Sequence, residues 1–197
     1  MTSTLFDDLA EPPLLIGLVG RAGSGKSTVA GLLAAEYGML QMAFADPVLD
    51  MICALFEAAD IDGAHAVERA LKEQPTALGY SYRHLAQTLG TEWGRHTLAP
   101  DFWVRVLARR VHAVLAIGDS VVVSDVRYDN EAAWLTERGG VLVRVLRDDA
   151  EPVREHDSER AADTLPVSHT LHNCGSFGTL ADQVMRLMDT LRARSPA

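Results

Sequence analysis

The stretch LLIGLVGRAGSGKST, residues 14–28, determines the fold expected for the rest of the chain. An apolar run of strand length ends in Gly20-x-x-x-x-Gly25-Lys26-Ser27, and a helical pattern begins directly behind it. A strand before and a helix after are the context that a phosphate-binding loop (P-loop) requires. Its glycines let successive N–H groups turn inward around phosphate oxygens, and the helix start adds the positive end of its dipole. The stretch therefore predicts a nucleoside triphosphate site.

Every residue of the loop is a candidate for nucleotide binding. The Lys26 ammonium is suited to the outer phosphates, and the Ser27 hydroxyl to a magnesium ion. The chain has only two lysines, Lys26 and Lys72, beside many arginines, so a lysine in the loop is favoured for its chemistry or reflects the composition of the genome. The predicted nucleotide-binding residues are Gly20, Arg21, Ala22, Gly23, Ser24, Gly25, Lys26, Ser27 and Thr28.

Length and composition are those of one soluble globular domain. The chain has 197 residues, 48% of them hydrophobic and 23% charged, with a net charge of −9. This charge argues against non-specific binding of nucleic acid polymers, which depends on cationic patches. No apolar run reaches the length of a membrane span, and no signal peptide is recognisable. Two distant cysteines, Cys53 and Cys174, match no metal spacing. We expect a cytoplasmic protein and leave its oligomeric state open, a homodimer included.

Strand and helix patterns alternate along the chain. Strands are expected at 14–19, 39–42, 120–125, 141–146 and 168–171. Helices are expected at 27–37, 47–59, from 81 to a break at Gly90, and at 101–117, 130–138 and 179–192. Residues 60–80 are predicted to be irregular with one short helix, and the polar segment 147–166 to be a functional lid or disordered. This alternation predicts a single three-layer α/β domain with a parallel central sheet.

Polar residues follow the strands, where ligands of open α/β sheets bind. Asp125 follows an apolar strand and is expected to hold magnesium, with capping of the next helix as the alternative. Asp46 precedes Pro47, so it either faces the acceptor phosphate or magnesium or serves only as a helix N-cap. Arg127, Arg147 and Asn173 lie at the ends of other strands.

Arginines and tryptophans add weaker candidates. Arg83, Arg95 and Arg127 suit bidentate phosphate binding, although each is equally compatible with a solvated surface charge. Trp93 and Trp103 suit stacking on a base, with core packing favoured for at least one of them.

Further motifs follow the P-loop in a fixed order. They are FADP (44–47), RxLxQxxGTE (83–92), DxWV (101–104), SDVRxxNE (124–131), GGxLVRV (139–145), HxSE (156–159) and NxG (173–175). In order and spacing, from residue 14 to the final helix, the sequence resembles the phage-type deoxynucleoside monophosphate kinases.

The resemblance implies transfer of the γ-phosphoryl group of ATP, with Mg²⁺, to a deoxynucleoside monophosphate. It implies catalytic roles for Lys26, Asp46, Asp125 and Arg127, and metal ligation by Ser27 and Asp125. Residues 47–98 become the acceptor region and 147–167 the lid. The acceptor-binding residues implied are Asp46, Arg83, Gln87, Thr91, Glu92, Trp103, Arg127 and Glu131. The lid residues implied are Arg147, Arg154, His156, Ser158 and Glu159, and Asn173 joins the ATP site.

Three other functions fit parts of the sequence. A P-loop kinase of another small acceptor, such as dephospho-coenzyme A, shares the architecture but fits the 87–92 and 125–131 segments poorly. A GTPase-type switch would need an Asn-Lys-x-Asp motif, and neither Asn130 nor Asn173 precedes a lysine. A nucleotide sensor without turnover is compatible with the same residues.

Overall fold

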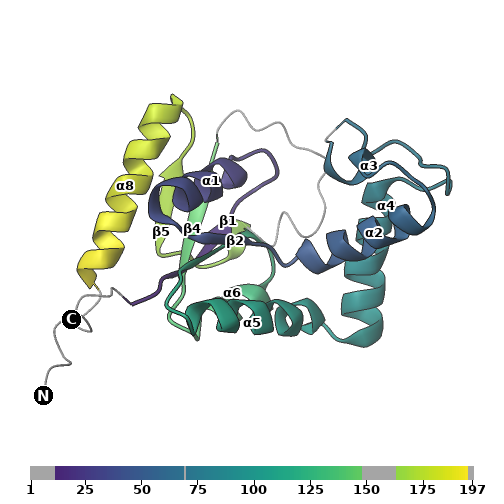
Figure 1. The fold of residues 1–197 in the computed structure, drawn as a ribbon. Coiled ribbons are helices and arrows are strands. Elements are labelled where there is room, and N and C mark those ends of the chain that lie inside the picture. The colour runs from purple at the N-terminus through teal and green to yellow at the C-terminus, as the bar shows by residue number, and fades with distance from the viewer. Residues whose placement is uncertain (1–11, 69, 148–162, 195–197) are drawn as a thin grey trace, which may run out of the picture. The chain divides into compact units, whose positions relative to one another are not determined.

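The computed structural model describes residues 12–68, 70–147 and 163–194, the side chain of residue 194 excepted (Figure 1). The chain divides into two compact units. Unit 1 comprises residues 12–42 and the described residues from Arg110 onward, and unit 2 comprises Ala43–Arg109. Each unit is described by itself below.

Unit 1 is built on a five-stranded sheet. Its strands are β1 (Leu15–Val19), β2 (Leu40–Met42), β3 (Val121–Val126), β4 (Val141–Leu146) and β5 (His169–His172). Their order is β2-β3-β1-β4-β5, and every neighbouring pair is parallel. The prediction of an α/β fold with a parallel central sheet is confirmed.

Helices cover both faces of this sheet. Helices α1 (Lys26–Tyr37) and α8 (Phe177–Arg194) lie on one face and α6 (Asp129–Thr136) on the other (Figure 1). Ile16 and Leu18 of β1 are fully buried against α1 and α8. Gly17 points to the opposite face, where an added Cβ would lie 2.6 Å from Leu135 of α6. Alternate residues of one strand therefore serve two helical layers, as a doubly covered parallel strand requires.

Unit 2 is helical. It contains α2 (Asp46–Ala58), the one-turn α3 (Ala64–Val67), α4 (Tyr82–Gln87), the π-helix η1 (Thr88–Leu98) and the first part of α5 (Phe102–Leu115). The expected irregular segment with one short helix is present at residues 59–68 and 70–81. The core of the unit consists of Val48, Ile52, Phe56, Ala66 and Trp103.

The predicted helix break at Gly90 is wrong. The backbone stays helical from Tyr82 to Leu98 and widens into a π-helix from Thr88. The Trp103 indole N–H donates to the Gly90 carbonyl over 2.7 Å, and a Cβ on Gly94 would lie 2.4–2.6 Å from the same indole. Gly94 therefore leaves room for a tryptophan from the next helix. Gly90 accepts a hydrogen bond from the same tryptophan and does not end its own helix. Within the described ranges, none of the helices has the length and apolar composition that crossing a bilayer requires.

Candidate active site

The P-loop has backbone angles that only glycine adopts readily. Gly20 has φ of +149°, and Gly25, which precedes α1, has φ of +100°. A Cβ on Gly20 would lie 2.5 Å from the Val145 carbonyl oxygen, and one on Gly25 would lie 2.2 Å from Asn173 Nδ2. Both glycines are therefore required by conformation and by space.

Lys26 is the first residue of α1, so the helix begins inside the loop. Its ammonium donates to the carbonyls of Gly20 (2.6 Å) and Arg21 (2.8 Å). The next two residues, Ser27 and Thr28, are exposed in the first helical turn, where backbone N–H groups have no partner within the helix. Cation, hydroxyl and helix start thus occupy the same few residues, which is a suitable arrangement for an anion with a bound metal.

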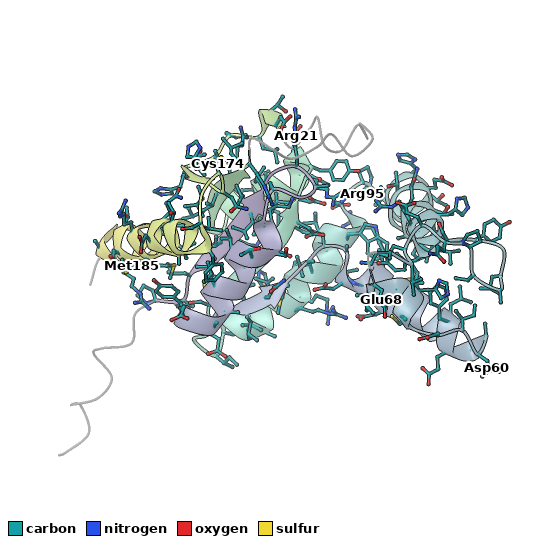
Figure 2. All side chains as sticks on the ribbon, turned by 90° about the horizontal axis from the view of Figure 1, so that it is seen from above. Arg21, Asp60, Glu68, Arg95, Cys174 and Met185 are labelled. Carbon is teal, nitrogen blue, oxygen red and sulfur yellow. The ribbon has the colours of Figure 1, made fainter. Side chains whose placement is uncertain are left out.

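Asn173 contacts the loop from a distant part of the chain. Its backbone N–H donates to the Leu146 carbonyl over 2.7 Å, and its side-chain Nδ2 donates to the Ser24 carbonyl over 3.0 Å. Figure 2 labels Arg21 on the loop and Cys174, the neighbour of Asn173, at the same edge of unit 1. The structure therefore brings Asn173 to the predicted nucleotide site, as a support of the loop backbone.

Asp125 lies near the end of β3, the strand next to β1. Gly17 pairs with Val123 but Val19 pairs with Val126, so the register shifts by one residue at Ser124 and Asp125. Such irregularities occur next to active sites, where they redirect a side chain. The N-cap residue of α6 is Tyr128, and the carboxylate of its capping box comes from Glu131.

The predicted role of Glu131 in substrate binding requires a correction, because its side chain is buried in the protein. Its side chain is 1% exposed, and Oε2 accepts the backbone N–H groups of Arg127 (2.8 Å) and Tyr128 (3.1 Å). This carboxylate fixes the turn that carries Arg127 instead of presenting a surface to substrate. The Arg127 side chain is exposed, and its guanidinium has no hydrogen-bond or ion-pair partner among the residues that the structure describes.

The predicted lid falls largely outside the described residues. Arg154, His156, Ser158 and Glu159 all lie there, whereas Arg147 is exposed directly after β4. Beyond this stretch, Asp163 Oδ2 accepts from Nε (3.0 Å) and Nη2 (2.6 Å) of Arg21. Arg144 Nη2 donates to the Leu165 carbonyl over 2.6 Å. The described C-terminal end of the predicted lid is therefore attached both to the P-loop and to β4.

Asp46 is the first residue of α2, and the N-cap position belongs to Ala45. The N-cap interpretation of Asp46 is therefore wrong. Its Oδ2 accepts the backbone N–H of Ala43 over 2.7 Å, which closes a tight turn over residues 43–46. The carboxylate is half-buried.

The remaining acceptor candidates in unit 2 differ in exposure. Arg83 is exposed and ion-paired with Glu73. Gln87 and Glu92 are exposed, Thr91 is half-buried, and both Thr91 and Glu92 lie on the π-helix. Trp103 is 3% exposed, which places it in the core, whereas Trp93 is 37% exposed. The expectation that core packing occupies at least one of these tryptophans is confirmed.

Tyr82 is a candidate that the sequence did not single out. The Lys72 ammonium lies 5.1 Å from the centre of its ring. Burial raises the pKa of Tyr82 above its ordinary value of 10.0, Cys53 and Asp46 raise it further, and Arg83 opposes them. The sequence assigned no role to Lys72 either, and only the fold shows that Tyr82 lies beneath it and that the charge of Asp46 acts on Tyr82.

Comparisons with known proteins agree with this geometry. Residues 61–184 match the family model for deoxynucleotide monophosphate kinase. A protein of Acanthamoeba polyphaga mimivirus with the provisional name deoxynucleotide monophosphate kinase is 31% identical over 161 residues, which cover 74% of this chain and 80% of that protein.

Two solved structures share the fold at low sequence identity. A provisionally named kinase from Chloroflexus aurantiacus has a TM-score of 0.51 and 14% identity, covering 91% of this chain and 98% of its own. A dephospho-CoA kinase from Campylobacter jejuni has a TM-score of 0.50 and 11% identity, and the match covers 90% of this chain and 96% of that protein. The family match and the viral relative go further than these fold neighbours: the chain belongs to the deoxynucleotide monophosphate kinase family.

Proposed function

We propose that this chain transfers the γ-phosphoryl group of ATP to the 5′-phosphate of a deoxynucleoside monophosphate. The observation that carries the proposal is the P-loop, in which Gly20 and Gly25 admit no side chain and Lys26 lies against the loop, within a chain of this family. An oxygen of the acceptor phosphate attacks the γ-phosphorus. The bond from that phosphorus to the β–γ bridging oxygen breaks, and ADP leaves with its electron pair.

Magnesium fits the residues at the edge of the sheet. The Ser27 hydroxyl and the Asp125 carboxylate are oxygen donors, the kind that Mg²⁺ prefers. When bound, the ion would neutralise charge on the β- and γ-phosphates. The residues proposed to hold it are Ser27 and Asp125, the latter directly or through water.

The chain's own cations supply the rest of the electrostatic stabilisation. When ATP binds, the Lys26 ammonium gives up its hydrogen bonds to the loop carbonyls and binds the outer phosphates instead. The exposed Arg127 guanidinium binds the phosphoryl group that is transferred. Phosphoryl transfer gains most from placement and from cations around the equatorial oxygens, since the protein forms no covalent bond. Asn173 contributes by holding the Ser24 carbonyl and with it the shape of the loop. Asp46 is proposed to face the acceptor.

An acceptor panel tests the proposal. ATP and Mg²⁺ are incubated with each common deoxynucleoside and ribonucleoside monophosphate, and with dephospho-coenzyme A because a fold neighbour bears that name. Diphosphate formation from one or more deoxynucleotides is the expected result. Turnover only with dephospho-coenzyme A, or ATP binding without any product, would contradict the proposal.

A further inference from the structure

A backbone hairpin in unit 2 brings together two basic residues that are distant in the sequence. The Arg83 N–H donates to the Lys72 carbonyl over 3.0 Å, and the Thr76 N–H donates to the Tyr80 carbonyl over 3.0 Å. Pro75 and Ser81 form an antiparallel bridge between these bonds. The hairpin therefore fixes Lys72 opposite the start of α4, which carries Tyr82 and Arg83.

The two cations of this hairpin, Arg83 and Lys72, have different partners. Arg83 forms an ion pair with Glu73, and the two side chains are 51% and 62% exposed. Lys72 is half-buried and lies over the Tyr82 ring. Among residues 12–68, 70–147 and 163–194, no carboxylate lies within ion-pair distance of the Lys72 ammonium. The positive charge that remains available in the hairpin is thus that of Lys72.

Tyr82 connects this cation to the face of unit 2 that includes Asp46. The tyrosine is part of the hydrophobic cluster formed with α2. The negative charge of Asp46 contributes to raising the pKa of Tyr82, after burial and Cys53. A ring held in this way orients the lysine without consuming its N–H donors, because a cation–π contact is made through the face of the ring.

We propose that Lys72, oriented by Tyr82, binds the 5′-phosphate of the acceptor nucleotide. The inference deepens the proposed function and rests on it. A protein of net charge −9 must bind a phosphate dianion through local positive charge. Arg83 has to leave Glu73 before it can contribute, whereas Lys72 has no carboxylate partner to leave among the residues that the structure describes. Lys72 therefore determines how tightly the acceptor binds, and Arg83 strengthens binding once Glu73 is displaced.

The test separates acceptor binding from ATP binding and from folding. Lys72→Met removes the charge at nearly constant length, Lys72→Arg keeps it, and Tyr82→Leu removes the ring beneath it. For each variant, KM for the deoxynucleotide and for ATP are measured together with the equilibrium Kd for the deoxynucleotide without ATP. Arg105→Met is the matched control, because Arg105 is an exposed cation of the same unit already paired with Asp101.

We expect Lys72→Met to raise KM and Kd for the deoxynucleotide about 10- to 100-fold, the range for a lost charge-assisted hydrogen bond. KM for ATP and kcat at saturating acceptor stay within about twofold. Lys72→Arg recovers most of the loss, and Tyr82→Leu gives an intermediate loss. A Lys72→Met enzyme with unchanged Kd and KM for the deoxynucleotide would overturn the inference and leave the kinase proposal intact. A wild-type enzyme that neither binds nor phosphorylates any deoxynucleotide would overturn both.

Discussion

The glycines of the P-loop in unit 1 and Gly94 on the π-helix of unit 2 serve different purposes. In unit 1, Gly20 and Gly25 have positive φ and form the phosphate loop within one short stretch of sequence. In unit 2, Gly94 has no positive φ, and its missing side chain leaves room for the Trp103 indole. The P-loop glycines can be recognised from the residues next to them in the sequence, whereas the role of Gly94 depends on a contact with another helix. Function in unit 1 is therefore readable from a motif, whereas unit 2 must be understood from its packing.

The two lysines give the sharpest test of this division. Lys26→Met is expected to lower kcat at least about 100-fold, because a cation on the transferring phosphoryl group stabilises the transition state. Lys72→Met should leave kcat near the wild-type value at saturating acceptor. Both variants should keep the wild-type circular dichroism spectrum. Equal losses of kcat in the two variants would remove the functional distinction between the units.

The packing role of Gly94 predicts a loss of stability. Gly94→Ala is expected to lower the free energy of unfolding by about 1–3 kcal/mol, since the added methyl group overlaps the indole of Trp103. Gly63→Ala is the matched control in the same unit, because its Cβ would meet nothing within 4 Å and its φ is −59°. Urea unfolding measures both. Similar midpoints for the two variants would contradict the packing explanation.

Glu131 is predicted to act through Arg127. Glu131→Gln weakens two backbone hydrogen bonds to a charged acceptor, so kcat should fall about tenfold through misplacement of the Arg127 side chain. Arg127→Ala should lower kcat further, and kcat of the double variant should be no lower than that of Arg127→Ala alone. A double variant in which the two losses multiply would mean that Glu131 acts independently.

Tyr82 predicts a smaller, pH-dependent effect. Its pKa is raised in the folded state, so the folded protein holds the phenolic proton more tightly than the unfolded chain. The stability that this proton contributes is complete below the unfolded pKa of about 10 and is lost as pH rises through the folded pKa. Between about pH 9 and 11, the free energy of unfolding of the wild type should therefore fall more steeply than that of Tyr82→Phe. Parallel curves would show that Tyr82 has no such linkage.

Much of unit 1 was predictable because its determinants are local. The apolar strands, the P-loop and the αL glycine at position 38 that caps α1 each lie within one segment, and the sheet follows from their alternation. Asp125 and Asn173 were predicted as site residues because ligands of open α/β sheets bind where the parallel strands end. Glu131 was assigned to substrate because the sequence does not reveal that its carboxylate turns back on two N–H groups three and four residues earlier.

Unit 2 was less predictable because its determinants are contacts between elements. Glycine often ends helices, so the sequence predicted a break at Gly90. The Gly90 carbonyl instead accepts a hydrogen bond from Trp103 on the next helix. The π-helix that results carries Thr91 and Glu92, and no periodicity in the sequence marked its wider turn. The placement of Lys72 over Tyr82 depends on a hairpin closed by backbone bonds, which side-chain patterns do not encode.

The most direct test of the account follows the γ-phosphorus itself. ATP labelled at the γ-phosphate is mixed with the enzyme, Mg²⁺ and a deoxynucleoside monophosphate, and the labelled products are separated. The account predicts that the label appears in the β-phosphate of the deoxynucleoside diphosphate, in equal amount to the ADP formed. Label found only in inorganic phosphate or remaining in ATP, with every deoxynucleotide supplied, would contradict it.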